Sequence, residues 1–471
     1  MTKHALRLLV VVMVVTLCVP AAWAQQKEKD PRLNPPIQPV GESSSKTPAE
    51  GSPPAAAPAL TPDQRPLSGV EDFSLGSFGG RSFLTAGLNV FQRMDSRSNS
   101  VPGSGTDVNG ATSVFGTVAL NKLFGRSTVT LDYATGGLLY NSDVASSAPM
   151  HKLGFSTSIQ GRRWTATIND YLTYLPESPF GFNGFGTPGL NFGNVPTVGP
   201  NSSPAQNIFA GTGSRLANTL VGQMNYQFSP RSSFTTSASY GVLRFFESGL
   251  NESNQYGFTG GYNYALNAED SISVSYGASL VRFLGFNQAF DSHSVQLGYG
   301  RRITGRLAFR VAAGTQVSQF DNPLAGDSTS LTWNASTSMT YAWPRSTLGL
   351  TYNRYTNAGS GVLVGATSHT IRGTLGRQLT RMWSTSFNGG YSRSTGLEQT
   401  NPSGRTVFNS WNAGVTANRP LGRYAGLTLN YNFQWQNSGT AVCVAGTCGT
   451  RFLAHQIGIG LNFSFRPINL E

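Results

Sequence analysis

The sequence predicts an all-β fold: a transmembrane antiparallel up-and-down β-barrel of about 18 strands, within a range of about 16–18. Two observations predict it. From about residue 82 to residue 465, apolar or aromatic residues alternate with small polar residues in runs of about ten, as expected for strands with one face in lipid and the other in water. The connections between the runs are alternately short and long, which is typical of membrane barrels.

The strands come in pairs around tight turns. Residues 220–228 alternate, the turn Ser229-Pro230-Arg231-Ser232 follows, and residues 234–240 alternate again. The expected strands are 82–93, 112–122, 128–140, 151–160, 163–175, 217–228, 233–246, 255–266, 271–283, 292–301, 306–320, 329–343, 346–356, 367–377, 382–393, 406–418, 424–436 and 451–465.

The short connections follow the even-numbered strands, as at Gly161-Arg162 and Pro344-Arg345. Outer-membrane barrels have short periplasmic turns and long external loops. The pattern therefore predicts a bacterial outer-membrane location, with the N-terminal tail and the C-terminus in the periplasm. A soluble sandwich, propeller or solenoid is the alternative fold, but the sequence shows no repeated blade motif.

The parity of each strand predicts which side chains face lipid. In the last strand the apolar set is Leu453, Ile457, Ile459, Leu461, Phe463 and Phe465. Aromatic residues also gather near strand ends, which predicts two girdles at the membrane interfaces. The expected turn-side girdle is Trp164, Tyr226, Phe228, Tyr264, Trp343, Trp383, Phe463 and Phe465, and the loop-side girdle is Tyr174, Phe283, Tyr355, Tyr391, Trp411 and Trp435.

Composition agrees with a membrane barrel. Charged residues make up 12% of the chain, against about 25% in ordinary soluble domains, while the mean hydropathy is only −0.19. The formal net charge of +12 comes largely from arginines in the short turns, so anionic lipid headgroups are the expected partner. A ring of arginines is not a nucleic-acid-binding pattern.

The first 80 residues differ from the rest. Residues 1–24 read as a secretory signal peptide, with Lys3 and Arg7 before an apolar core and Ala22-Trp23-Ala24 as the cleavage site; an uncleaved anchor and a lipoprotein at Cys18 are the alternatives. Residues 25–70 form a Pro-rich segment, expected to be a disordered periplasmic tail. It serves as a spacer or as a tether to the cell wall or an export partner. Residues 71–471 form the barrel.

Two cysteines remain after the signal peptide, Cys443 and Cys448, five positions apart in one external loop. In an exported protein this spacing favours a loop-closing disulfide. The neighbouring sequence offers no other ligands for a metal.

These features together resemble the porin-type barrels of Gram-negative outer membranes, over about residues 82–466 and by architecture. The longest loop, about 176–216, is the third external loop, and the segment Asp170-Tyr-Leu-Thr-Tyr-Leu-Pro176-Glu177 is similar to the start of the porin loop that folds inward. The resemblance implies that this loop narrows the pore, with Glu177, Phe180, Phe182, Phe185 and Arg215 as constriction candidates. It also implies folding by the barrel-assembly machinery, and it leaves a homotrimer open.

The inward parity is mostly Ser, Thr, Asn, Gln and Gly, and the charged pore-lining candidates are Asp132, Lys152, Arg310 and Arg372. We expect a passive diffusion channel for small polar solutes with weak charge selectivity. The alternatives are a non-conducting structural or surface-interaction barrel and the outer-membrane part of a polysaccharide export system. An enzyme is not expected, because the four mature histidines show no catalytic spacing with Ser and Asp. No cofactor or metal motif appears.

Overall fold

The computed structural model describes residues 82–99, 107–141, 147–176, 214–246, 250–284, 288–321, 328–357, 363, 365–397, 406–444 and 447–470. The signal peptide and the tail expected before residue 71 lie outside these ranges, as do Glu177, Phe180, Phe182 and Phe185. The described part includes no helix long and apolar enough to span a membrane.

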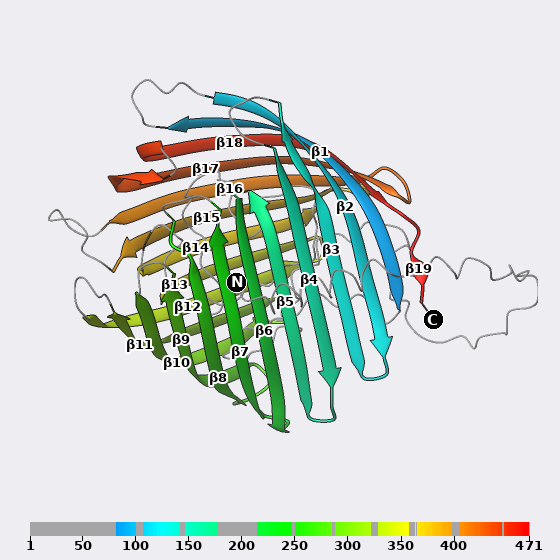
Figure 1. Ribbon diagram of the computed structural model, residues 1–471. Helices are drawn as coiled ribbons and strands as arrows, with labels where there is room; N and C mark the ends of the chain where they lie inside the picture. Colours follow the sequence, from blue (N-terminus) through cyan, green and yellow to red (C-terminus); the bar gives the residue numbers. More distant parts are fainter. Residues whose placement is uncertain are drawn as a thin grey trace, which may run out of the picture. The chain divides into compact units, whose positions relative to one another are not determined.

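The described residues form one closed antiparallel β-barrel of 18 wall strands (Figure 1). Each strand pairs with its neighbours in the sequence, and β1 closes the wall against β18 from Gly87↔Ser464 to Asn99↔Phe452. The predicted fold class is confirmed. The strands are β1 Phe83–Asn99, β2 Asp107–Phe124, β3 Ser127–Tyr140, β4 Ala148–Gln160, β5 Trp164–Pro176, β6 Ser214–Ser229, β7 Ser232–Phe245, β8 Ser253–Ala265, β9 Asp270–Phe283, β10 Ala289–Thr304, β11 Leu307–Asp321, β12 Ser328–Trp343, β13 Ser346–Asn357, β14 Ala366–Gln378, β15 Ser384–Gly396, β16 Val407–Pro420, β17 Ala425–Val444 and β18 Thr447–Ser464.

A two-residue strand, β19 (Ile468–Asn469), continues the pairing of β18 along β1, with Phe83 opposite Asn469. The chain end is held there by side chains as well, because Lys122 Nζ donates to the Leu470 carbonyl at 2.7 Å. The end of the chain therefore lies at the same end of the barrel as the start of β1.

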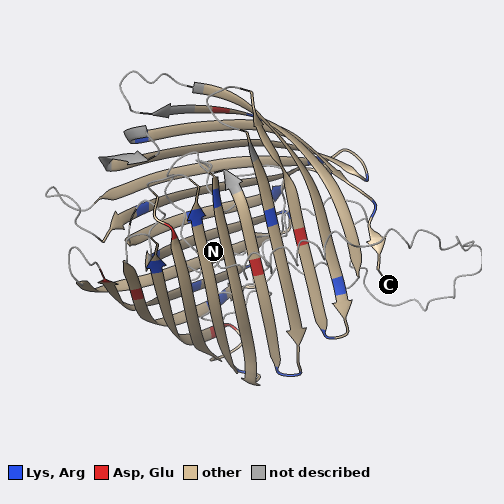
Figure 2. Ribbon diagram, viewed as in Figure 1, with Lys and Arg blue, Asp and Glu red and all other residues tan. Residues whose placement is uncertain are grey.

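The connections alternate in length as predicted except after β17, where the expected long external loop is instead a tight hairpin because the ladder extends to Val444↔Thr447. Those after even-numbered strands are short, none exceeding the five residues from Leu379 to Trp383. We call this end of the barrel the turn end and the other the loop end. Lysines and arginines mark the hairpin tips at the turn end, while the wall between the ends carries few charges (Figure 2).

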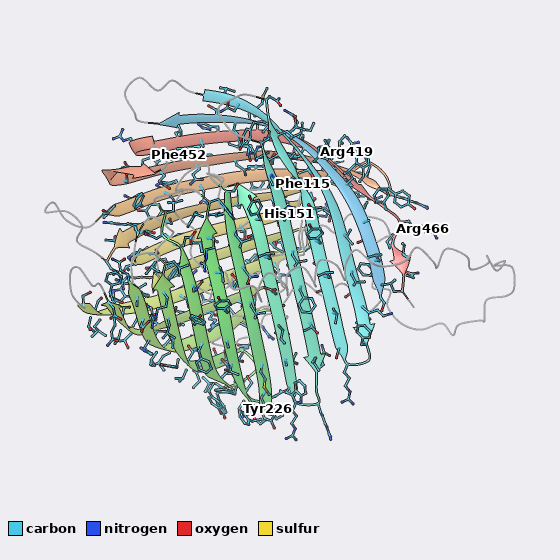
Figure 3. All side chains as sticks on the ribbon, viewed as in Figure 1. Phe115, His151, Tyr226, Arg419, Phe452 and Arg466 are labelled. Carbon is cyan, nitrogen blue, oxygen red and sulfur yellow. The ribbon has the colours of Figure 1, made fainter. Side chains whose placement is uncertain are left out.

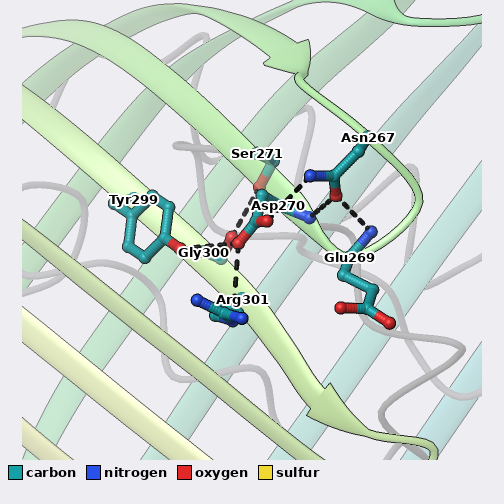
Figure 4. A network of polar contacts seen from close by, with 7 residues as sticks. All are labelled: Asn267, Glu269, Asp270, Ser271, Tyr299, Gly300 and Arg301. Atoms are coloured by element: carbon teal, nitrogen blue, oxygen red, sulfur yellow. Dashed lines mark hydrogen bonds and ion pairs between the residues drawn. The ribbon is translucent and has the colours of Figure 1, made fainter.

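The turn between β8 and β9 shows how a tight connection is built (Figure 4). Asn267 Oδ1 accepts hydrogen bonds from the backbone N–H of Glu269 at 2.7 Å and Asp270 at 2.6 Å, so the side chain holds the turn. The Asp270 carboxylate accepts from Tyr299 Oη at 2.5 Å and lies 3.7 Å from Arg301 Nε. An acid at this basic rim is thus neutralised by the neighbouring strand.

The outward face is an apolar belt. Leu297, Ile457 and Val274 are 66%, 62% and 50% exposed, although each lies in the middle of a strand. Outward aromatic residues border the belt, with half-buried Tyr226 near the turn end of β6 and Tyr174 beside His151 nearer the loop end (Figure 3). In lipid, only a helix or a closed barrel satisfies its backbone polar groups. The closed wall and the apolar outward face are accordingly those of a membrane-spanning β-barrel.

Inward glycines let aromatic rings lie flat on the wall. Phe91 on β1 faces Gly460, and its ring covers Gly458 and Gly460 so closely that a Cβ on either glycine would lie 2.3 Å from a ring carbon. Phe115 on β2 covers Gly136 on β3 in the same way, 2.8 Å from the position of an added Cβ. These rings fill the space that the glycines leave.

Gly136→Ala is therefore expected to weaken the barrel. A Cβ at Gly136 would also lie 1.9 Å from the Val114 carbonyl oxygen, so backbone must shift, and overpacking of this kind costs about 1–3 kcal/mol. The measurement is the temperature at which the folded, fast-migrating form disappears on a semi-denaturing gel. Gly137→Ala is the control, because nothing lies within 4 Å of an added Cβ there; equal behaviour of the two variants would contradict this packing.

Candidate channel lining and external mouth

The inward face changes character along the barrel. Toward the turn end it carries small polar side chains, such as Ser271 and Ser273 on β9 and Thr428 and Asn430 on β17. Many are bonded to one another across strands. Asn462 Nδ2 donates to Thr428 Oγ1 at 2.9 Å. This half of the interior is therefore a polar surface with few charges.

The four charged candidates all lie on inward-facing positions, in two groups. Asp132 on β3 and Lys152 on β4 are diagonal neighbours, because Asp132 pairs with Gly154 and Ala134 pairs with Lys152. Arg310 on β11 and Arg372 on β14 lie about half-way around the strand order from them. An acid and a base thus share one wall, and two bases lie on the opposite wall.

A fifth and a sixth charged group face inward on β1. Arg93 and Asp95 are 6% and 1% exposed and form an ion pair, with Nε 3.3 Å from Oδ2. Arg93 also donates to the Tyr140 hydroxyl at 3.1 Å, and Gln456 Nε2 donates to Asp95 at 2.9 Å. Sequence reasoning missed the pair because it ended this strand at residue 93. The alternation of outward Leu88, Val90 and Met94 with these residues was the signal that could have found it.

Toward the loop end the inward face carries apolar clusters among buried polar side chains such as Gln255, Ser318 and Ser394. Three clusters of buried residues lie there, each with a neighbour packed against it: Ala111, Phe115, Leu138 and Met150 with Tyr140; Ala217, Leu243 and Phe245 with Leu250; and Val281, Phe283, Phe290 and Phe320 with Leu397. The loop-end interior is therefore a mixed surface, in which three apolar clusters lie beside buried polar side chains such as Asp95, Ser368 and Gln456.

Phe283 was expected in the loop-side girdle, and this prediction was wrong. The ring is 6% exposed and belongs to the cluster with Val281, Phe290 and Phe320. It shares the inward parity of β9 with Ser279 and Val281, whereas Leu280 points outward. Position near a strand end was a weaker guide than parity.

Leu397 shows that the mouth is narrowed from one side. It follows β15, yet it packs against side chains of β9, β10 and β11. Gln316 on β11 makes a second link, because its Nε2 donates to the Thr356 carbonyl at 3.1 Å and its Oε1 accepts from the Thr356 N–H at 3.2 Å. The loop ends of β13 to β15 thus lean over the interior toward β11.

The wall has a seam beside this contact, which we define as the unpaired loop-end part of β12 and β13. Their ladder runs from Trp343↔Ser346 only to Ala335↔Arg354. Beyond it, β12 from Ser328 to Asn334 pairs with β11 alone, and β13 from Tyr355 to Asn357 pairs with β14 alone. Side chains close the seam, since Arg354 Nη1 donates to the Trp333 carbonyl and Thr332 Oγ1 lies 3.5 Å from Thr356 Oγ1.

Of the constriction candidates, Arg215 alone is described. It was expected in the long loop, but it is the second residue of β6 and is 3% exposed on the inward parity. The correction has a simple cause: β5 and β6 extend to Pro176↔Ser214, so the ladder includes residues that were assigned to the loop. Cys443 and Cys448 occupy opposite positions of the β17–β18 hairpin, a placement that leaves the expected disulfide open to test.

The histidines do not form catalytic sets. Each mature histidine faces outward, and its Nδ1 is hydrogen bonded to a tyrosine hydroxyl on the preceding strand: His151 with Tyr133, His293 with Tyr276, His369 with Tyr352 and His455 with Tyr431. In the described ranges, no group of three or more His, Cys, Asp or Glu side chains could hold a metal. This arrangement favours an interfacial role for the histidines.

Comparisons with known proteins yield structural likenesses only. No family model matches the chain, and no curated protein matches it. Among solved structures, Acinetobacter baumannii OccAB3 is similar at 10% identity and a TM-score of 0.43, covering 81% of this chain and 99% of its own. Pseudomonas aeruginosa OccK2 (OpdF) is similar at 12% identity and a TM-score of 0.42, covering 81% and 98%. Likenesses at this level assign the chain to no family.

Proposed function

We propose that the barrel is a passive diffusion channel for small polar solutes, with weak charge selectivity and its narrowest part toward the loop end. The observation that carries the proposal is the inward face itself, which is polar and bonded in its turn-end half. Barrels of 16–18 strands enclose an aqueous channel unless a loop or domain fills them. Because the side chains on this wall are small, they do not fill the turn-end half of the interior. Any filling of the barrel therefore comes from the loop end.

Two features support a constriction at the loop end. The apolar clusters on β2–β4, β6–β7 and β9–β11 occupy the inward face there, and Leu397 spans toward one of them from β15. The loop of about residues 176–216 joins β5 to β6 at the same end, and we propose that it adds to the constriction through Phe180, Phe182 and Phe185. A solute entering from the loop end would then pass a partly apolar constriction before it reaches the polar interior at the turn end.

Weak charge selectivity follows from the few inward charges. Asp132 and Lys152 offset each other on one wall, and Arg93 and Asp95 form a closed pair. Arg215, Arg310 and Arg372 leave a modest positive excess. We expect neutral and mildly anionic solutes to pass through the channel.

A non-conducting barrel is the second candidate, whether as a structural or surface protein or as part of an export system. The three apolar clusters at the loop end favour it, because a mouth that such packing closed completely would admit no water. Conductance separates the two candidates directly.

The purified protein is expected to conduct ions in a planar bilayer, and deletion of residues 178–214 is expected to raise the single-channel conductance because part of the constriction is removed. A control deletion within the turn-end tip, Gly305, should leave conductance within the scatter of the full chain if the barrel folds. A barrel that never conducts, even after the loop deletion, would establish the non-conducting alternative.

Charge substitutions are expected to shift ion selectivity in opposite directions. Arg310→Gln combined with Arg372→Gln should move the reversal potential in a salt gradient toward cation preference, and Asp132→Asn should move it toward anion preference. A unit charge about 7 Å from an ion in water contributes about 0.6 kcal/mol, or about a threefold change in permeability ratio. Outward Arg282→Gln is the control; shifts of the same sign for all three would contradict an inward role for these charges.

A further inference from the structure

Near the loop end, the outward wall carries a row of two arginines, on β13 and β15, with a histidine between them on β14. Arg354 is directly opposite His369, and His369 is directly opposite Arg393. All three belong to the outward parity of their strands, together with exposed Leu350 and Ile371. Adjacent strands lie about 4.8 Å apart, so the two arginines are about 10 Å from each other at their backbones. We call these three residues the cationic row.

Specific contacts hold the side chains of Arg354 and His369 in the cationic row. The Arg354 guanidinium lies 3.8 Å from the centre of the Trp333 ring and donates Nη1 to the Trp333 carbonyl. Its Nε donates to His369 Nε2 at 3.3 Å. The imidazole therefore carries its proton on Nδ1, which donates to the Tyr352 hydroxyl at 3.3 Å. Stacking and hydrogen bonds hold this cation in place at the lipid-facing surface.

The other histidines provide a comparison within the same barrel. Each forms the same diagonal pair with a tyrosine, but His293 has Ala278 and Val317 as its cross-strand neighbours, and His455 has Phe433 and Ser96. His369 is flanked by arginines on both sides. The Tyr–His pair is thus a repeated part of the girdle, and the arginines are a local addition to it.

The cationic row also lacks the acids that accompany other outward arginines. Arg244 lies 3.7 Å from Glu252, and Arg282 binds both oxygens of Asp291, one of them at 3.2 Å. By contrast, β12 to β16 contain no Asp or Glu. Among the described residues of β12 to β16, Arg354 and Arg393 therefore have no carboxylate to pair with.

We propose that the cationic row binds the phosphate of a glycolipid headgroup in the outer leaflet. Arginine matches phosphate oxygens through paired N–H donors, and an outward position at the edge of the apolar belt is at headgroup depth. Ile371 and Leu350, which are 50% and 40% exposed, lie on the turn side of the row and offer apolar surface for the acyl chains. A lipid satisfies both features at once, whereas a free anion uses only the charges.

Arg354 also has a structural task, because it caps the Trp333 carbonyl at the seam. Arg393 has no such bond to the seam, and it is exposed. Arg393 is therefore the residue whose substitution tests binding with the least effect on the wall.

The test measures lipid binding to the full chain in detergent by native mass spectrometry. The probes are bis-phosphorylated lipid A and a dephosphorylated lipid A with the same acyl chains. The unsubstituted protein is expected to retain the phosphorylated lipid at least tenfold more tightly. Arg393→Gln should weaken that binding about tenfold, since it removes charge-assisted hydrogen bonds to the phosphate. Arg393→Gln with Arg354→Lys should weaken it further.

Arg282→Gln is the matched control, an outward arginine paired with an acid, and should bind as the unsubstituted chain does. Gel mobility of each variant before heating verifies the barrel, and Arg393→Lys replaces any variant that does not fold. Equal retention of the two lipids, unchanged binding by Arg393→Gln, or displacement of the lipid by millimolar inorganic phosphate would overturn the proposal; the last result would assign the site to a free anion.

Discussion

Backbone hydrogen bonding in lipid is the constraint on which the rest of the structure depends. An unpaired N–H or C=O costs several kcal/mol in hydrocarbon, so each strand must be paired on both sides. The β1–β18 ladder meets this requirement for the first and last strands. Closure then fixes the parity of every strand, and parity separates the apolar exterior from the polar interior.

The seam is the place where the wall departs from this rule. Between β12 and β13 the ladder stops short of the loop end, and side chains take over part of the bonding through Arg354, Gln316 and Thr356. The departure accompanies the inward lean of β13 to β15 and the contact of Leu397 with the β9–β11 cluster. The narrowed mouth and the cationic row thus both lie beside the seam, and Arg354 belongs to the row and to the seam.

The fold could be predicted from the sequence because the signals for strands and turns lie within short stretches of the chain. Alternation in β17 or β18 is visible in ten consecutive residues, and turn residues such as Pro344-Arg345 mark the hairpins directly. The same pattern placed Asp132, Lys152, Arg310 and Arg372 on the inward parity. These predictions depend on period and not on which distant strands approach each other.

The mouth and the seam were not predictable in this way. Parity indicates that Phe283 and Phe290 face inward, but not that they meet Leu397, since that contact joins strands that are not neighbours in the wall. Residues at strand ends were also misjudged: β1 continues past residue 93 to include Asp95, and β6 begins early enough to include Arg215. A β-ladder can continue past the membrane wherever both strands of a hairpin stay paired. The local hydrophobic pattern does not indicate at which residue the pairing ends.

The central claim is a channel with a polar vestibule at the turn end and a constriction at the loop end. Polymer exclusion tests it most directly: poly(ethylene glycol) of graded size is added to one side of a bilayer holding a single oriented channel, and conductance is recorded. The account predicts a larger size limit on the turn-end side: polymers too large to enter from the loop end should still enter from the turn end and lower the conductance. The same size limit from both sides, or a larger one from the loop end, would contradict it.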